Sequence, residues 1–150
     1  MSGLQYAAPV SVDEAVGLLA NAKGMARVLA GGTDLLVQMR AGMVRPDLVV
    51  DIKCIGELHK ISGSASAGFT IGATVSGQEI GEHKALLKAW PGVVEGMELI
   101  GSTQIQSRAT PAGNLCNGSP AGDCTPALFA AGAVCVIAGP KGRREVPVEQ

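Results

Sequence analysis

The sequence feature that most constrains the fold is an alternation of helix and strand patterns within the first 52 residues. Residues 11–14, Ser-Val-Asp-Glu, form a capping-box pattern, after which apolar residues recur at helical spacing up to Leu19. Residues 26–30 fit a short buried strand, a second helix is expected to run to Arg40, and residues 47–52 fit a second strand. Helices between consecutive strands favour parallel pairing, so we predict a small α/β lobe over residues 1–53.

The pattern changes after Lys53, where hairpins and short helices are expected in place of the regular alternation. The expected elements are a turn at 63–68, a strand at 69–73, helices beginning near residues 76, 91 and 125, and a hairpin over residues 134–148. Residues 76–79, Ser-Gly-Gln-Glu, form a second possible capping box. The helix after Pro91 is expected to present one apolar face made of Val93, Val94, Met97 and Ile100. Between residues 101 and 125 regular periodicity fades, and a polar loop is expected there. We therefore predict a second, α+β lobe over residues 54–150.

Composition excludes several classes of function. The 12 basic and 13 acidic residues give a formal net charge of -1, and aromatic residues make up 3% of the chain, so nucleic-acid binding is disfavoured. No apolar run approaches the ~20 residues of a membrane span, and the first nine residues lack the pattern of a signal peptide, so we expect a cytoplasmic protein. Glycine is in excess, with 21 residues in 150, and its placement beside Thr, Asn and Asp indicates special backbone turns.

Cysteine and histidine provide no metal-binding pattern. The four cysteines form no CxxC pair, so free and mostly buried thiols are expected: Cys54, Cys116, Cys124 and Cys135. His59 and His83 are expected at the surface or at helix ends.

The first candidate binding segment is a glycine-rich turn between the expected strand at 26–30 and the helix that follows. Such a turn brings free amides and a helix start to one place, and two glycines let the backbone approach phosphate oxygens. Asp34 is unusual for a phosphate site, and it either caps the helix or binds a sugar hydroxyl or ring nitrogen. An ordinary tight turn remains the alternative. The segment consists of Ala30, Gly31, Gly32, Thr33, Asp34 and Leu35.

The second candidate segment is the polar stretch that runs from residue 110 to residue 123. A buried loop of this kind needs partners for its backbone groups, and a bound cofactor would supply them. Thr110, Gly113 and Asn114 are its candidate ligands at one end, and Asp123 could accept bonds from ribityl or ribose hydroxyls at the other. The alternative is a structural loop whose Asn and Asp side chains satisfy local turns.

Taken together and in order, these segments resemble the FAD-binding medium subunit of the molybdenum hydroxylases, a family that includes the flavin subunits of carbon monoxide dehydrogenase and xanthine dehydrogenase. The matching pieces are Ala-Gly-Gly-Thr-Asp-Leu-Leu at 30–36, Thr-Ile-Gly-Ala at 70–73, residues 104–108, Thr110, Gly-Asn-Leu at 113–115, Ser-Pro-Ala-Gly-Asp at 119–123 and Pro-Ala-Leu at 126–128. Each piece is weak alone, but the ordered series is specific and covers essentially the whole chain.

The resemblance implies a two-lobed FAD-binding fold of the vanillyl-alcohol-oxidase or PCMH type, α+β overall with an α/β first lobe and an incomplete second lobe. It implies that residues 30–35 wrap the diphosphate from the first lobe, and that Thr110, Gly113 and Asn114 approach it from the second. Asp123 would contact the polyol or phosphate side of the flavin. The chain would then be an oxidoreductase subunit for electron transfer, with a [2Fe-2S] subunit and a molybdopterin subunit as partners and NAD or another acceptor as the destination.

Two departures from the family pattern keep alternatives open. Pro111 and Ala112 stand where the family usually has Ile-Gly, which removes an amide donor and adds a methyl group, and family members run to nearly twice this length. The chain could therefore be an assembly module, or a truncated remnant of the subunit that does not retain FAD. A flavin oxidase of the same fold with its own substrate is a third possibility, although only the two scattered histidines offer a base.

Overall fold

The computed structural model describes residues 3–150, and its first part is a three-stranded parallel sheet. The strands are β1 (Gln5–Ala7), β3 (Leu48–Asp51) and β2 (Ala26–Leu29), with β3 in the centre. The predicted parallel pairing of the two strands is confirmed, with Leu29 opposite Asp51 at the carboxyl end. Strand β1 is not predicted from the sequence, because this three-residue strand has mostly exposed side chains and gives no buried pattern.

Helix α1 (Val12–Ala20) packs on this sheet through Val12 and Ala15. Ser11 accepts a hydrogen bond from the Glu14 amide at 3.2 Å, as predicted. Glu14, however, reaches back to the amide of Val10 at 3.0 Å rather than to that of Ser11. One carboxylate and one hydroxyl thus satisfy two amides at the start of the helix.

The chain then passes through α2 (Leu35–Arg40), two 3-10 turns and the hairpin of β4 (Ile61–Ser64) and β5 (Gly68–Ile71). Three helices follow: α3 (Gly77–Glu82), α4 (Lys84–Ala89) and α5 (Pro91–Glu98). The capping box predicted at Ser76 and Glu79 is confirmed in both directions. The predicted apolar face of α5 is confirmed too, since Val94 and Met97 are fully buried.

The remaining elements are α6 (Thr103–Gln106), α7 (Pro111–Asn117), α8 (Cys124–Ala130) and the hairpin of β6 (Val134–Gly139) and β7 (Gly142–Pro147). The hairpin is confirmed. The prediction of a polar loop between residues 101 and 125 is wrong in part, because α6 and α7 lie within this stretch. Their turns are rich in Ser, Thr, Asn and Gly, so apolar periodicity could not reveal them.

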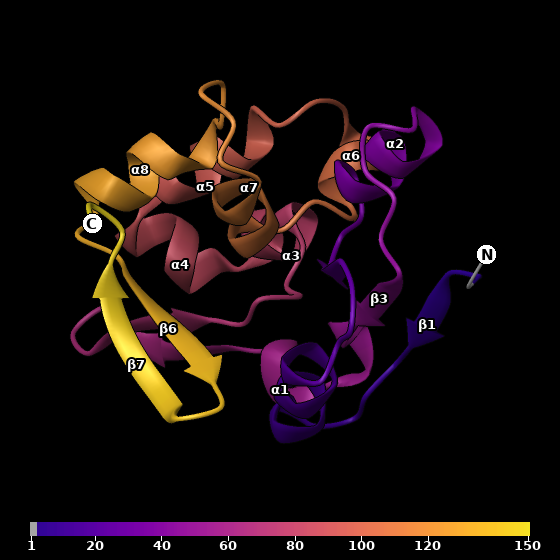
Figure 1. Ribbon diagram of the computed structural model, residues 1–150. Coiled ribbons are helices and arrows are strands. Elements are labelled where there is room, and N and C mark those ends of the chain that lie inside the picture. The colour runs from indigo at the N-terminus through magenta and orange to yellow at the C-terminus, as the bar shows by residue number, and fades with distance from the viewer. Residues whose placement is uncertain (1–2) are drawn as a thin grey trace.

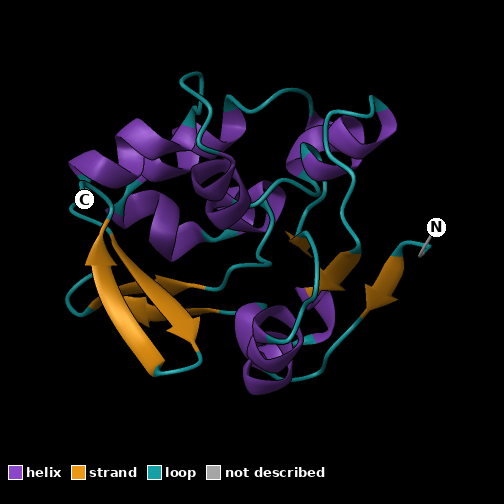
Figure 2. Cartoon of the chain, in the orientation of Figure 1, coloured by secondary structure: helices purple, strands orange, loops and turns teal. Residues whose placement is uncertain are grey.

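Two clusters of buried side chains form the core. The first joins α1 and β3 through Val12 and Val50, and the second joins α3, α5 and α8 through Ile80, Met97 and Cys124. In Figure 1 the parallel sheet and α1 lie apart from the group formed by α5, α7 and α8, and Figure 2 shows that most helices gather in that second group. The lobe boundary predicted between residues 53 and 54 stays a prediction. Ile55, just beyond that position, packs in the first cluster.

Among residues 3–150, no helix has the length and apolar character needed to cross a bilayer.

Candidate functional site

A cleft of about 650 Å³ lies where the two candidate segments meet. This volume falls within the ~300–1,000 Å³ that is typical of small-molecule and cofactor sites. Nine of the ten predicted site residues line it: Ala30, Gly31, Gly32, Thr33, Asp34, Leu35, Thr110, Gly113 and Asn114. Segments about eighty residues apart in sequence thus share one cleft.

The first turn begins where β2 ends, and its two glycines serve different purposes. Gly32 has φ of +79°, a left-handed conformation that favours glycine. Gly31 lies against the backbone of Arg108 and Ala109, so closely that a methyl group on it would overlap the Arg108 carbonyl. Within residues 3–150, the amides of Gly32, Thr33 and Asp34 have no hydrogen-bond partner. The residues that line one wall of the cleft therefore include three whose amides have no partner within the described chain.

The second segment contributes the start of a helix rather than a loop. Thr110, which is 3% exposed, caps α7 by accepting the Gly113 amide at 3.0 Å. Pro111 occupies the first helical position, where its missing N–H costs nothing because that amide has no intrahelical acceptor. The Ala112 amide also finds no acceptor among the described residues, so it adds a donor to the opposite wall.

Side chains bridge the two walls across the cleft's rim. Asn117 donates to Asp34 at 3.1 Å and accepts from Gln38 at 3.1 Å, which ties α7 to α2. Asp34 makes no side-chain cap at the start of α2, so the capping alternative is wrong for this residue. Its carboxylate is oriented by Asn117 instead.

Asp123 is the one predicted site residue that does not line the cleft. It stands immediately before α8 with an exposed side chain, and it makes no side-chain cap there. Its neighbour Cys124 is fully buried and lies 3.0 Å from the side-chain oxygen of Asn114. Cys124, which follows the polar segment 119–123, therefore contacts the cleft wall at Asn114, and a flavin contact of Asp123 stays a prediction.

A charge cluster around the buried carboxylate of Asp51 holds the base of the first turn. Asp51, which is 6% exposed, accepts hydrogen bonds from the Tyr6 hydroxyl at 2.6 Å and from Lys53 Nζ at 2.7 Å. Lys53 also donates to the Ala30 carbonyl at 3.3 Å. Burial acts to raise the pKa of Asp51, but the bonds from Lys53 and Tyr6 outweigh it and lower the pKa below its ordinary value. The carboxylate thus stays charged and fixes Lys53 against the turn.

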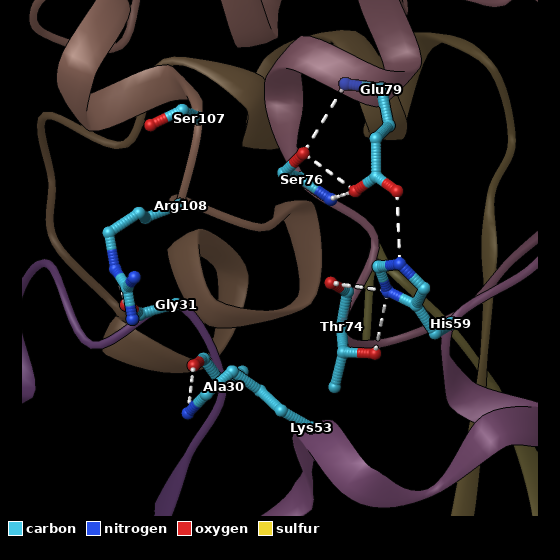
Figure 3. A pocket seen from close by; sticks show the side chains of 9 residues that line it. All are labelled: Ala30, Gly31, Lys53, His59, Thr74, Ser76, Glu79, Ser107 and Arg108. Atoms are coloured by element: carbon cyan, nitrogen blue, oxygen red, sulfur yellow. Dashed lines mark hydrogen bonds and ion pairs between the residues drawn. The ribbon is translucent and has the colours of Figure 1, made fainter.

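A second cavity of about 220 Å³ is also lined by Ala30 and Gly31, and Figure 3 shows the side chains around it. Its polar groups are paired with one another. His59 lies 3.0 Å from Glu79, and Glu79 in turn accepts from Ser76 at 2.7 Å. With the Lys53 ammonium held by Asp51 and Ala30, this cavity offers a ligand few free donors besides the Arg108 guanidinium.

The histidines and cysteines add no catalytic cluster. The prediction of surface or helix-end histidines is confirmed, because His83 caps α4 and the His59 side chain is half exposed. All four thiols are free, but only Cys124 is buried, so the expectation of mostly buried cysteines is wrong. Within residues 3–150, no group of three potential ligands could hold a metal ion.

Several residues of the site were missed from the sequence. Arg27 lines the cleft and brings a cation to it, while Gln38 and Asn117 bridge its walls. The alternation of side chains along a strand could have placed the exposed Arg27 on one face of β2. No sequence pattern links Asn117 to Asp34. Their proximity depends on the packing of two distant helices.

Unpaired amides from two segments distant in sequence, a cation and a cofactor-sized cleft are the features of a domain that binds an anionic cofactor. The sequence matches, over residues 2–150, the family described as the FAD binding domain in molybdopterin dehydrogenase. The chain therefore belongs to the FAD-binding family of the molybdenum hydroxylase medium subunits, and its fold is the PCMH-type fold predicted above.

Known relatives agree in sequence and in structure. The carbon monoxide dehydrogenase medium chain of Hydrogenophaga pseudoflava is 34% identical over 97% of this chain and 50% of its own length. The xanthine dehydrogenase FAD-binding subunit of Escherichia coli O157:H7 is 30% identical over 95% of this chain and 49% of its own. A solved carbon monoxide dehydrogenase from H. pseudoflava superposes with a TM-score of 0.91, again over 97% and 50%. The chain thus spans about half the length of the relatives it matches.

Proposed function

We propose that this chain holds FAD in the cleft between the two turns, as part of the electron-transfer subunit of a molybdenum-containing hydroxylase or dehydrogenase. The observation that carries the proposal is the set of unpaired amides on both walls, at Gly32, Thr33, Asp34 and Ala112. The oxygens of a diphosphate are acceptors only, so they complement such a set. The likeness to flavin subunits over 97% of the chain supports the same ligand.

Each wall has its own task. The turn at 30–35 offers main-chain donors and is kept rigid by Lys53 and by its contact with Arg108. Thr110 fixes the start of α7, so that Gly113 and Asn114 face the cleft in a set geometry. Arg27 lies on the same cleft and offsets part of the diphosphate charge.

The bound cofactor would supply the redox chemistry, taking electrons from [2Fe-2S] clusters of one partner subunit, fed by a molybdopterin subunit, and passing them to NAD or another acceptor. No side chain of this chain is assigned an acid or base role in that transfer, because the flavin carries the chemistry and the protein binds and orients it.

The test is an FAD titration of the purified chain, followed by flavin fluorescence and by absorbance after gel filtration. We expect retention in the wild type and at least tenfold weaker binding in Asn114→Ala, since a hydrogen bond to a charged group contributes ~1.5–3 kcal/mol. Lys141→Ala, in the exposed turn between β6 and β7, is the matched control and should bind like the wild type. Equal affinity in all three proteins would remove the second segment from the site.

A second candidate function is that of an assembly module that retains no flavin. Exposed apolar side chains near the C-terminal hairpin favour it, because Phe129 is 57% exposed and Val136 is 59% exposed. Co-expression with [2Fe-2S] and molybdopterin subunits distinguishes the two functions. Co-purification of all three chains without bound flavin would support the assembly module.

A further inference from the structure

The side chain of Asn114 is held from behind by the segment that leads into α8. Cys124 Sγ lies 3.0 Å from Asn114 Oδ1, and a methyl group placed on Gly122 would stand 3.2 Å from the same oxygen. Asn114 itself lines the cleft. Its carboxamide therefore lies between the cleft on one side and residues 122–124 on the other.

The thiol of Cys124 is suited to donate to that oxygen. Cys124 is 0% exposed and belongs to the core cluster with Val94 and Met97, so its position is fixed by packing. Its other acceptor, the Pro111 carbonyl, is farther away at 3.8 Å. Burial raises the pKa of Cys124 to about 11, so at neutral pH the group is a protonated donor.

A carboxamide has one acceptor and two donors, and its orientation decides which of them faces a ligand. When Oδ1 is engaged by the thiol, Nδ2 keeps both of its N–H groups for the cleft. A rotated amide would instead present a carbonyl oxygen to a cleft that, under the proposed function, receives an anion. The orientation of the Asn114 carboxamide therefore decides whether this side chain attracts or repels an anion in the cleft.

We propose that Cys124 is a positioning residue for Asn114: its S–H donates to Oδ1 and orients Nδ2 toward the bound cofactor. This inference rests on the proposed function, and it assigns a role to the polar stretch before α8. Asp123 is exposed and lies outside the cleft lining, while Cys124 contacts Asn114 directly and a methyl group on Gly122 would crowd the same oxygen. The stretch thus acts through Asn114.

The test compares Cys124→Val, which removes the donor and keeps a core-sized apolar group, with Cys124→Ser, which restores a donor. We expect FAD affinity to fall about fivefold in Cys124→Val, as for the loss of one net hydrogen bond, and to recover in Cys124→Ser. In an Asn114→Ala background, Cys124→Val should have no further effect. Equal affinity of Cys124→Val and wild type, or additive effects of the two substitutions, would overturn the assignment.

A measurement without FAD keeps this inference separate from the proposed function. The side-chain amide signals of Asn114 in a nitrogen-proton NMR spectrum should move in Cys124→Val and stay near their wild-type positions in Cys124→Ser. Unchanged signals in Cys124→Val, with the backbone spectrum still folded, would refute the thiol contact. If the wild-type chain binds no FAD, the proposed function fails, and this spectrum alone decides whether the thiol orients the amide.

Discussion

Gly31 and Arg108 are in contact through their backbones, although 77 positions separate them in the sequence. The Cα of Gly31 lies against the Arg108 carbonyl, and Arg108 Nε lies 3.4 Å from the Gly31 carbonyl. This contact brings the first turn to the residues that precede α7. The shape of the cleft therefore depends on Gly31. A glycine is required at this position by backbone packing, whether or not the residue also contacts a ligand.

Gly31→Ala should destabilise the protein by about 1–3 kcal/mol, because the added methyl overlaps backbone atoms that cannot rotate away. Urea unfolding measures the change. Gly17→Ala is the matched control: it lies inside α1 with open space around it and should stabilise by up to about 1 kcal/mol through helix propensity. A Gly31→Ala protein as stable as the wild type would show that the two segments separate at little cost.

Asn117→Ala should loosen α2 by removing both hydrogen bonds that tie it to α7. Because these side chains are largely exposed, we expect less than about 1 kcal/mol in global stability, but faster amide exchange in α2. Asn21→Ala, which removes the bond from Asn21 to the Gly17 carbonyl at the end of α1, is the control. Faster exchange of α2 in both variants would point to a general loss of stability.

The Asp51 cluster predicts how stability depends on pH. The folded pKa of Asp51 lies below the ordinary value of 3.8, so its contribution is present above that value and is lost as pH falls through the folded pKa. Asp51→Asn should lower the free energy of unfolding at neutral pH by about 1–3 kcal/mol. It should also reduce the loss of stability at acid pH, which is the acid limb of the plot of unfolding free energy against pH. Urea unfolding at a series of pH values measures both.

Glu79 has a lowered pKa as well, because its bonds from Ser76 and its proximity to His59 outweigh the effect of burial. In Glu79→Gln, the loss of stability at acid pH that is due to Asp51 should therefore remain. An Asp51→Asn protein with the full wild-type acid limb would contradict the assignment of that limb to Asp51.

Ser76→Ala should cost about 1 kcal/mol, because it removes the cap of α3 and leaves the Glu79 carboxylate with one partner fewer. Thermal or urea unfolding measures it. Ser62→Ala, at an exposed position of β4, should change stability little. Equal changes in stability in the two variants would mean that the capping box contributes nothing to the free energy of unfolding.

Local patterns in the sequence were enough to predict the elements whose signals are local. The parallel pairing of β2 with β3, the capping box at Ser76 and the C-terminal hairpin follow from side-chain period, capping chemistry and turn residues, all of which act within a few positions. The ordered motifs also sufficed to predict the family. The helix at Pro111–Asn117 was missed because its polar, glycine-containing turn has the composition of a loop.

The sequence by itself determined which residues could surround a cofactor, and tertiary structure decided how they meet. Gly31 against Arg108, Asn117 on Asp34 and Cys124 on Asn114 are contacts between segments that are distant in sequence or separated by a turn. Such contacts follow from the packing of the two core clusters and leave no periodic trace along the chain. For that reason nine predicted site residues line one cleft, whereas Asp123 lies outside its lining.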